Sequence, residues 1–188
     1  MGMPAMQERR WTAAEVRALP DEPGKRFEVV DGELLVSPGP TFRHQYVLSR
    51  LFAVLCPYVD GNRLGAVLWG PGEVELDDHT MVQPDLFVVR REEVKSLGDA
   101  QAVRDPMLLI EALSPSTARY DRVVKRGRYQ RQRIEYWVVD FEARLVERWQ
   151  PDASRPEIIA DFLEWHPTQV DRPLVIDLVS LFEAALGA

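Results

Sequence analysis

The sequence predicts an α/β or α+β domain in which helices flank a mixed central β-sheet, with a β-hairpin near the N-terminus. Three observations support this fold class. The apolar run MLLIEAL at 107–113 is typical of a strand that is covered on both faces. Segments with alternating apolar residues and segments with apolar residues at helical spacing surround this run. Asp31-Gly32 joins two alternating runs, which is a strong signal for a hairpin.

The elements follow from these patterns in chain order. In the first half we expect a short helix at 12–19, the hairpin at 26–38, a helix at 41–59 that ends near Pro57, and strands at 65–69, 72–78 and 82–90. In the second half we expect a helical turn at 91–97, the buried strand at 107–113, a second long helix at 117–131, strands at 135–140 and 144–150 that form a hairpin, and a closing helix at 175–186.

Length and composition restrict the class of protein. The 188 residues fit a single domain, 1–188, that is long enough to bury a core. The N-terminus has no apolar signal region and no segment approaches the roughly 18 to 20 apolar residues of a membrane span, so we expect a cytoplasmic protein without membrane contact. Cys56 is the single cysteine, which excludes an internal disulfide and a multi-cysteine zinc site.

Charge argues against a protein that coats nucleic acid non-specifically, because the net charge is −7. A local basic surface remains compatible with this total. The segment 119–133 contains seven Lys and Arg residues and a single acid, Asp121. A charge run of this kind is most often a solvated helix face, and a phosphate-binding surface is the alternative.

The most informative residue is Glu111, because it lies in the middle of the buried apolar run. A buried carboxylate without a partner costs several kcal/mol. Asp85 begins the strand in QPDLFVV, and alternation places its side chain on one face of that strand with Phe87. In the same way, Glu111 shares one face of its own strand with Leu109. If the two strands are neighbours, both carboxylates converge on one point. Together with a backbone carbonyl they suit Mg²⁺ or Mn²⁺.

The helix at 117–131 supplies a third group. Asp121, Lys125 and Tyr129 recur every four residues, and an ammonium near a metal could orient water and stabilise charge on a phosphate. The alternative is a surface pair of Asp121 and Lys125 worth a few tenths of a kcal/mol. On a regular α-helix this ridge only borders the packed face.

Four segments together resemble a known family. FEVVDGELLVSPGPTFRHQ, VQPDLFVV, IEALSPSTARYDRVVKRGRYQ and EYWVVD occur in this order between about residues 27 and 140. They resemble signatures of a large bacterial family described as putative restriction endonucleases, similar in core to PD-(D/E)xK nucleases and Holliday-junction resolvases. The resemblance implies a restriction endonuclease-like core at about 27–150, in which Asp85 and Glu111 correspond to the metal-binding acids.

One position departs from the nuclease pattern. Leu113 stands two residues after the second acid, where the nucleases carry a lysine. In the family this role passes to a lysine on the next helix, which corresponds to Lys125 here. Glu28 and His44 also match family positions. Glu28 could reach the site as a further acid or face solvent, while a histidine in the place of His44 is more often an ordinary hydrogen-bonding residue.

The sequence therefore favours a Mg²⁺-dependent endodeoxyribonuclease with catalytic Asp85, Glu111 and Lys125, the two acids also being the metal ligands. Additional site residues are Glu28, His44 and Tyr129, and the candidates for gripping DNA phosphates are Arg119, Arg122 and Arg126. A homodimer is expected, because nucleases of this core often pair to cut two strands. One alternative is an inactive nuclease-fold protein that binds nucleic acid or a partner. A weaker one is a metal-free hydrolase with paired carboxylates, as in glycosidases.

Overall fold

The computed structural model describes residues 9–98 and 102–187. Its strands form three sheets, with the orders β10-β9-β8-β7-β6-β3, β2-β1-β5-β4 and β11-β12. In the first half of the chain the elements are α1 (Ala13–Arg17), β1 (Lys25–Val30), β2 (Glu33–Pro38), α2 (Phe42–Gly61), β3 (Gly65–Trp69), β4 (Val74–Asp77), β5 (Thr80–Val82), β6 (Leu86–Arg90) and α3 (Arg91–Val94). In the second half they are β7 (Pro106–Ala112), α4 (Ala118–Tyr120), the π-helix η1 (Asp121–Lys125), α5 (Arg126–Arg131), β8 (Glu135–Asp140), β9 (Leu145–Trp149), β10 (Glu157–Ile159), β11 (Phe162–Trp165), β12 (Leu174–Asp177) and α6 (Leu178–Leu186).

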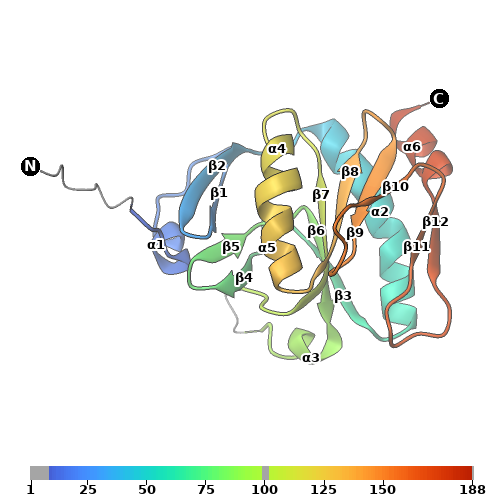
Figure 1. Ribbon diagram of the computed structural model, residues 1–188, viewed down its shortest axis with the longest axis horizontal. Helices are drawn as coiled ribbons and strands as arrows, with labels where there is room; N and C mark the ends of the chain where they lie inside the picture. Colours follow the sequence, from blue (N-terminus) through green and yellow to red (C-terminus); the bar gives the residue numbers. More distant parts are fainter. Residues whose placement is uncertain (1–8, 99–101, 188) are drawn as a thin grey trace, which may run out of the picture.

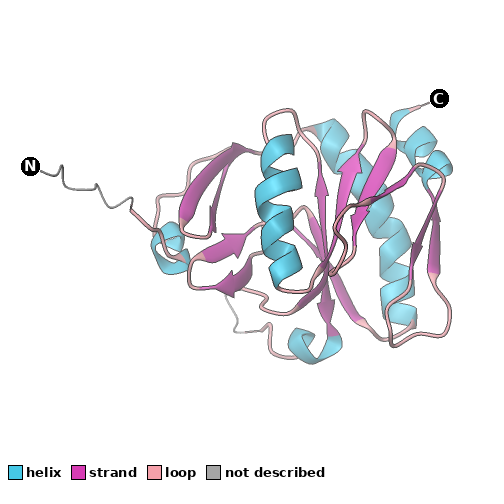
Figure 2. Cartoon of the chain, viewed as in Figure 1, coloured by secondary structure: helices cyan, strands magenta, loops and turns pink. Residues whose placement is uncertain are grey.

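The six-stranded sheet is the middle layer of the molecule. Its strand β7 pairs with β8 in parallel and with β6 in antiparallel orientation. The segment α4–η1–α5 crosses over from β7 to β8 in front of the sheet in Figure 1, and α2 and α6 lie behind it. Figure 2 shows the same layers by element type. The predicted class is confirmed, since helices flank a mixed sheet whose central strand is buried.

Two apolar clusters fill the space on either side of this sheet. The cluster on the α2 and α6 face includes Leu51, Val88 and Ile110, and the cluster on the α5 face includes Phe87 and Leu109. Successive residues of β6 and β7 thus alternate between the two clusters, as side chains on strands do. This alternation fixes the face onto which every other side chain of β6 and β7 projects.

The N-terminal hairpin is also confirmed. Strands β1 and β2 pair in antiparallel register from Val30 opposite Glu33 onward. The two residues between them, Asp31 and Gly32, have φ values of 52° and 88°. Positive φ at both positions is what a tight hairpin turn requires, which explains the Asp-Gly sequence.

The predicted strand at 82–90 is wrong in one respect, because the chain changes sheets within it. Strand β5 belongs to the four-stranded sheet and β6 to the six-stranded sheet. Pro84 lacks a backbone N–H, and the N–H of Gln83 donates to the side chain of Glu28 at 2.7 Å instead of to a neighbouring strand. Asp85 therefore lies at the junction of the two sheets.

Two other boundaries differ from the prediction, and three strands were not predicted. Helix α2 continues past Pro57 to Gly61, because the buried Val59 keeps the last turn packed on the core. The closing helix begins at Leu178, since 175–177 pair with β11 and the side chain of Asp177 caps the helix. Strands β10, β11 and β12 were not predicted. Within the described ranges, none of the helices combines the length and apolar character that a membrane span needs.

Candidate active site

Asp85 and Glu111 lie side by side on neighbouring strands. Leu86 is opposite Ile110 in the antiparallel pair β6–β7, so Asp85 comes next to Glu111 one position further along. The backbone N–H of Ala112 donates to Asp85 Oδ2 at 2.9 Å, which ties the first acid to the strand of the second. Both carboxylates are buried. The sequence-based expectation of two converging acids is therefore met geometrically.

Lys125 reaches these acids from the π-helix. Its Nζ lies 2.8 Å from Glu111 Oε1, 2.9 Å from Glu28 Oε2 and 3.6 Å from Asp121 Oδ1. The expectation that Lys125 would only border the packed face is wrong, because it is 5% exposed. The cause is the π-turn, whose i→i+5 hydrogen bonds widen the helix and change the direction of the following side chains. A surface pair of Asp121 and Lys125 is ruled out as well, since both are buried.

Strand β1 contributes two more charged side chains. Arg26 and Glu28 are two residues apart on the strand, so their side chains lie on the same face, and both line the pocket. Glu28 is buried and contacts Lys125, so the solvent-facing alternative for Glu28 is wrong. Arg26 Nη1 donates to Asp85 Oδ1 at 2.7 Å. Sequence reasoning missed Arg26, although its spacing of two residues from Glu28 was a usable signal.

His44 approaches from the opposite side of the sheet. It lies in the first turn of α2, where the side chain of Thr41 caps the helix by accepting from the His44 N–H. Its ring Nε2 is 3.0 Å from Asp85 Oδ2 and 3.0 Å from the carbonyl oxygen of Ala112. His44 is thus a buried neighbour of the first acid rather than a residue of the helix surface.

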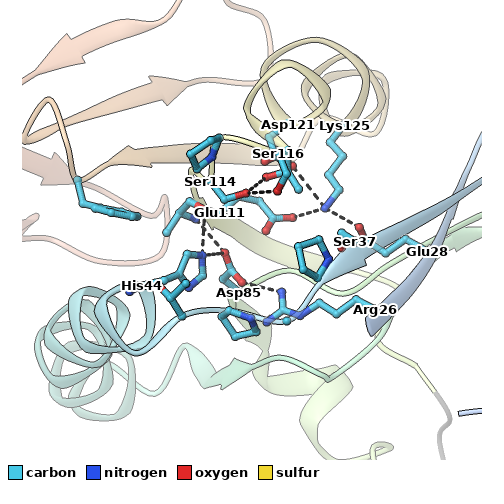
Figure 3. Close-up of a pocket in the computed structure, with 18 residues that line it drawn as sticks. Arg26, Glu28, Ser37, His44, Asp85, Glu111, Ser114, Ser116, Asp121 and Lys125 are labelled. Atoms are coloured by element: carbon cyan, nitrogen blue, oxygen red, sulfur yellow. Dashed lines mark hydrogen bonds and ion pairs between the residues drawn. The ribbon is translucent and has the colours of Figure 1, made fainter. Parts of the chain in front are cut away.

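These groups line one cavity of about 260 Å³. Figure 3 shows Arg26 and Glu28 reaching it from β1, His44 from α2, and Asp121 and Lys125 from the helical crossover. The loop after β7 closes one side with hydroxyl groups. The polar and charged residues of the lining are Arg26, Glu28, Ser37, Thr41, His44, Asp85, Glu111, Ser114, Ser116, Thr117, Asp121 and Lys125.

The two central acids differ in their proton affinity. Burial alone would raise the pKa of Asp85, but the hydrogen bond and charge of His44, together with Arg26, outweigh burial and lower this pKa to about 2. Burial raises the pKa of Glu111 well above its usual range. Lys125 opposes that increase, whereas the charges of Asp85 and Asp121 add to it. The site therefore holds one firmly ionised acid beside one whose ionisation needs more positive charge.

The donor set suits a hard divalent cation. Four carboxyl groups line the cavity beside the cations Arg26 and Lys125, so a bound cation would supply the positive charge that keeps the carboxyl groups ionised. Carboxylate and carbonyl oxygens are the ligands that Mg²⁺ and Mn²⁺ prefer. Asp85, Glu111 and the carbonyl of Ala112 are the groups that would hold such an ion. Within residues 9–98 and 102–187, no three side chains of His, Cys, Asp and Glu form a ready metal cluster.

Other predicted residues lie outside this cavity. Tyr129 is fully buried in the core below it, with its ring against Tyr136 at a centroid distance of 4.9 Å. Arg122 donates to Glu147 at 2.7 Å and to Asp140 at 3.0 Å. Two further arginines complete the predicted set. The guanidinium of Arg126 covers the ring of Trp149, and Arg119 is exposed without a hydrogen bond or ion pair to the described part of the chain.

Comparison with known proteins agrees with this architecture. A crystal structure of a putative nuclease of Anabaena variabilis, assigned to DUF820, superposes with a TM-score of 0.78 and 21% identity, covering 93% of this chain and 99% of the other. An uncharacterized protein of Synechocystis sp. is 24% identical over 155 residues, which is 81% of this chain and 87% of the relative. The family model Uma2, described as "Putative restriction endonuclease", matches residues 13–180. This match spans most of the chain, which therefore belongs to the Uma2 family of putative restriction endonucleases.

Proposed function

We propose that this protein is a metal-dependent endodeoxyribonuclease that hydrolyses phosphodiester bonds at the cavity of Asp85, Glu111 and Lys125. One observation carries the proposal: two buried acids on adjacent strands share a cavity with an ammonium 2.8 Å from the second acid. Membership in a family of putative restriction endonucleases supports the same reaction class. Mg²⁺ or Mn²⁺ is the proposed cofactor.

Each side chain has a distinct task in this proposal. Asp85 stays ionised because its pKa is about 2, so it presents a carboxylate at every physiological pH. Glu111 becomes a second carboxylate when positive charge is added beside it. Mg²⁺ held by these acids would supply Lewis acidity to the phosphate and to the attacking water. Lys125 keeps its proton, because its carboxylate neighbours raise its pKa despite the opposing effect of burial, and it stabilises negative charge on the phosphate oxygens.

Arg26 and His44 hold the first acid in place. Arg26 binds Asp85 Oδ1 and His44 contacts Asp85 Oδ2, so both oxygens are oriented before substrate arrives. This fixes the carboxylate relative to the strand of Glu111, as pre-organised catalysis requires. We propose that both act as positioning residues.

The test is a cleavage assay with plasmid and oligonucleotide DNA in Mg²⁺ or Mn²⁺. Asp85→Asn and Glu111→Gln should abolish cleavage while the fold is retained. Glu75→Gln is a matched control, because Glu75 is 6% exposed and Asp85 5%, both pair with arginine, and Glu75 lies outside the cavity. Cleavage that persists in both site variants would place the chemistry elsewhere.

A second candidate is an inactive nuclease-fold protein that binds nucleic acid. The internal ion pairs favour it, since Arg26 and Lys125 already contact Asp85 and Glu111 without any metal. The two functions separate in one measurement. DNA binding by the wild-type protein, combined with no cleavage at millimolar Mg²⁺ or Mn²⁺, would favour the binding protein.

A further inference from the structure

A second hollow lies directly beside the carboxylate cavity. It has a volume of about 350 Å³ and shares the lining residues Arg26, Pro40 and Asp85 with that cavity. The rest of its wall is largely apolar and comes mainly from α2 and the ends of β3 and β6, with Phe52 and Trp69 as its aromatic residues. A ligand in this hollow would therefore contact the proposed reaction centre.

Trp69 is an unusual residue for this position. It ends strand β3 opposite Leu86, and it is 60% exposed. The following N–H, of Gly70, donates to the backbone carbonyl of Asp85 at 3.2 Å. This hydrogen bond holds the chain directly after Trp69 against the backbone of Asp85, the first acid. Phe52 supports it from α2, with the two rings at right angles and their centroids 5.1 Å apart.

The rim of the hollow is polar. Gln45 and Ser49 from α2 line it together with the guanidinium of Arg26. An amide and a hydroxyl can both donate and accept hydrogen bonds, and a guanidinium binds phosphate oxygens. The hollow thus combines a flat aromatic surface, hydrogen-bonding groups at its edge and a guanidinium that also lines the carboxylate cavity.

We propose that this hollow binds one nucleobase of the nucleic acid cleaved at the neighbouring site, with the base stacked on Trp69. The proposal rests on the nuclease function proposed above and extends it. A nucleobase has two apolar faces and a polar edge, which matches the aromatic wall and the polar rim. The phosphate attached to its sugar would lie next to Arg26 and Asp85, which line both hollows. A nucleobase is the proposed occupant because the hollow adjoins the carboxylate cavity, where the phosphodiester bond would be cleaved.

The substrate class follows from the same geometry. A base inside a duplex is already stacked on both faces, so a base on Trp69 must be unpaired or extruded. We infer that the preferred substrate carries an unpaired nucleotide beside the cleaved bond, as single strands, flaps and junctions do. Intact linear duplex should be a poorer ligand.

The test measures binding without cleavage. Fluorescence anisotropy of a labelled single-stranded oligonucleotide is recorded with a chelator present, so that metal-dependent hydrolysis does not contribute. Trp69→Ala should weaken binding by about 5- to 150-fold, the range expected for loss of one base–aromatic stack. Trp69→Phe keeps a stacking ring and should lose less than about threefold. Phe162→Ala removes an aromatic residue of equal exposure, 60%, from distant β11 and should change nothing.

A second comparison uses two ligands. The wild-type protein should bind the single strand more tightly than a blunt duplex of the same length, and Trp69→Ala should remove that preference. Equal affinity of wild type and Trp69→Ala for the single strand would overturn the proposal. The proposal would also be overturned if the wild type were a dimer, Trp69→Ala a monomer, and the affinity for the single strand the same in both. The hollow would then be an interface between two copies.

The outcome separates this proposal from the proposed nuclease activity. If Trp69→Ala weakens binding and the wild type cleaves nothing in Mg²⁺ or Mn²⁺, the base subsite stands and the nuclease proposal fails. If the wild type cleaves DNA and Trp69→Ala binds and cleaves as well as wild type, the nuclease proposal stands and the base subsite fails. If no oligonucleotide binds to the wild type at all, the base subsite is contradicted.

Discussion

The ammonium of Lys125 lies 2.8 Å from the carboxylate of Glu111, and the two residues are 14 positions apart in the chain. This contact joins the central strand β7 to the helical crossover that follows it. It also brings Lys125 to the second acid, although the resemblance to PD-(D/E)xK nucleases implied a lysine at the position that Leu113 occupies. The lysine therefore comes from the π-helix and not from the end of β7.

The first prediction concerns Lys125 in catalysis. Lys125→Met should slow single-turnover cleavage by at least about tenfold and change DNA affinity by less than about twofold, because one positioned charge acts mainly on the transition state. Single-turnover kinetics and anisotropy titration measure the two effects. A variant that lost affinity but kept its rate would make Lys125 a binding residue only.

The second prediction concerns the same side chain in stability. Lys125→Met leaves Glu28 and Glu111 buried without their cation, which should lower the free energy of unfolding by about 3 kcal/mol or more. Urea unfolding measures this value. In a double-mutant cycle with Glu111→Gln, the two effects should not add, because the two side chains are in direct contact. Purely additive effects would show that the contact contributes nothing.

The third prediction uses the raised pKa of Glu111. Its ordinary value is 4.5, and burial raises it although Lys125 opposes the change. Between pH 4.5 and the raised pKa, the folded protein binds one proton more than the unfolded chain. The linked stability is fully present below pH 4.5 and is lost as the pH rises through the raised pKa.

Metal-free wild-type protein should therefore lose stability relative to Glu111→Gln as the pH rises, by at most about 1.4 kcal/mol per pH unit. Urea unfolding in a chelator between pH 4.5 and pH 8 gives the difference between the two proteins. Millimolar Mg²⁺ should reduce the loss in wild type alone. A difference that stays constant over this range would show that Glu111 ionises as easily in the folded state as in the unfolded state.

The fourth prediction tests the π-helix. Deleting Val123, an exposed residue of η1, should restore regular α-helical hydrogen bonding over the turn that carries Lys125. Lys125 then loses the orientation toward Glu28 and Glu111 that the π-turn gives it, so cleavage should fall to background. Val123→Ala keeps the chain length and is the control that should retain activity. Circular dichroism checks that both variants keep their helices.

The fifth prediction separates the arginines that were candidates for gripping DNA. Arg119 is the exposed member of the set, so Arg119→Ala should weaken DNA binding and lower its salt slope by about one. Arg122 is held by Glu147 and Asp140, so Arg122→Ala should affect stability more than affinity. Titrations at several salt concentrations and urea unfolding give both values. A larger salt effect from Arg122→Ala would show that its ion pairs open when DNA binds.

Local pattern was sufficient to predict part of the site. A charged residue in a buried apolar run identified Glu111, and strand alternation placed Asp85 on the corresponding face of its own strand. Both inferences depend on the two-residue period of a strand, which hardly changes with tertiary context. The hairpin was predictable for a similar reason, since Asp31-Gly32 specifies its own turn.

The remaining features depend on contacts between distant segments. The depth of Lys125 could not be predicted from a 3.6-residue period, because the π-turn alters that period locally. The change of sheet before Asp85 depends on Glu28 accepting from the N–H of Gln83, a contact across 55 residues of chain. His44 reaches Asp85 from a helix on the other side of the sheet, and no local pattern reports that approach.

Asp85 and Glu111 are proposed to share one divalent cation, and diffraction from crystals soaked in Mn²⁺ tests this most directly. The predicted result is an anomalous peak between the two carboxylates, in contact with the carbonyl of Ala112, which disappears in Asp85→Asn and persists in Glu75→Gln. The absence of a peak between Asp85 and Glu111 in wild-type crystals at millimolar Mn²⁺ would contradict the claim.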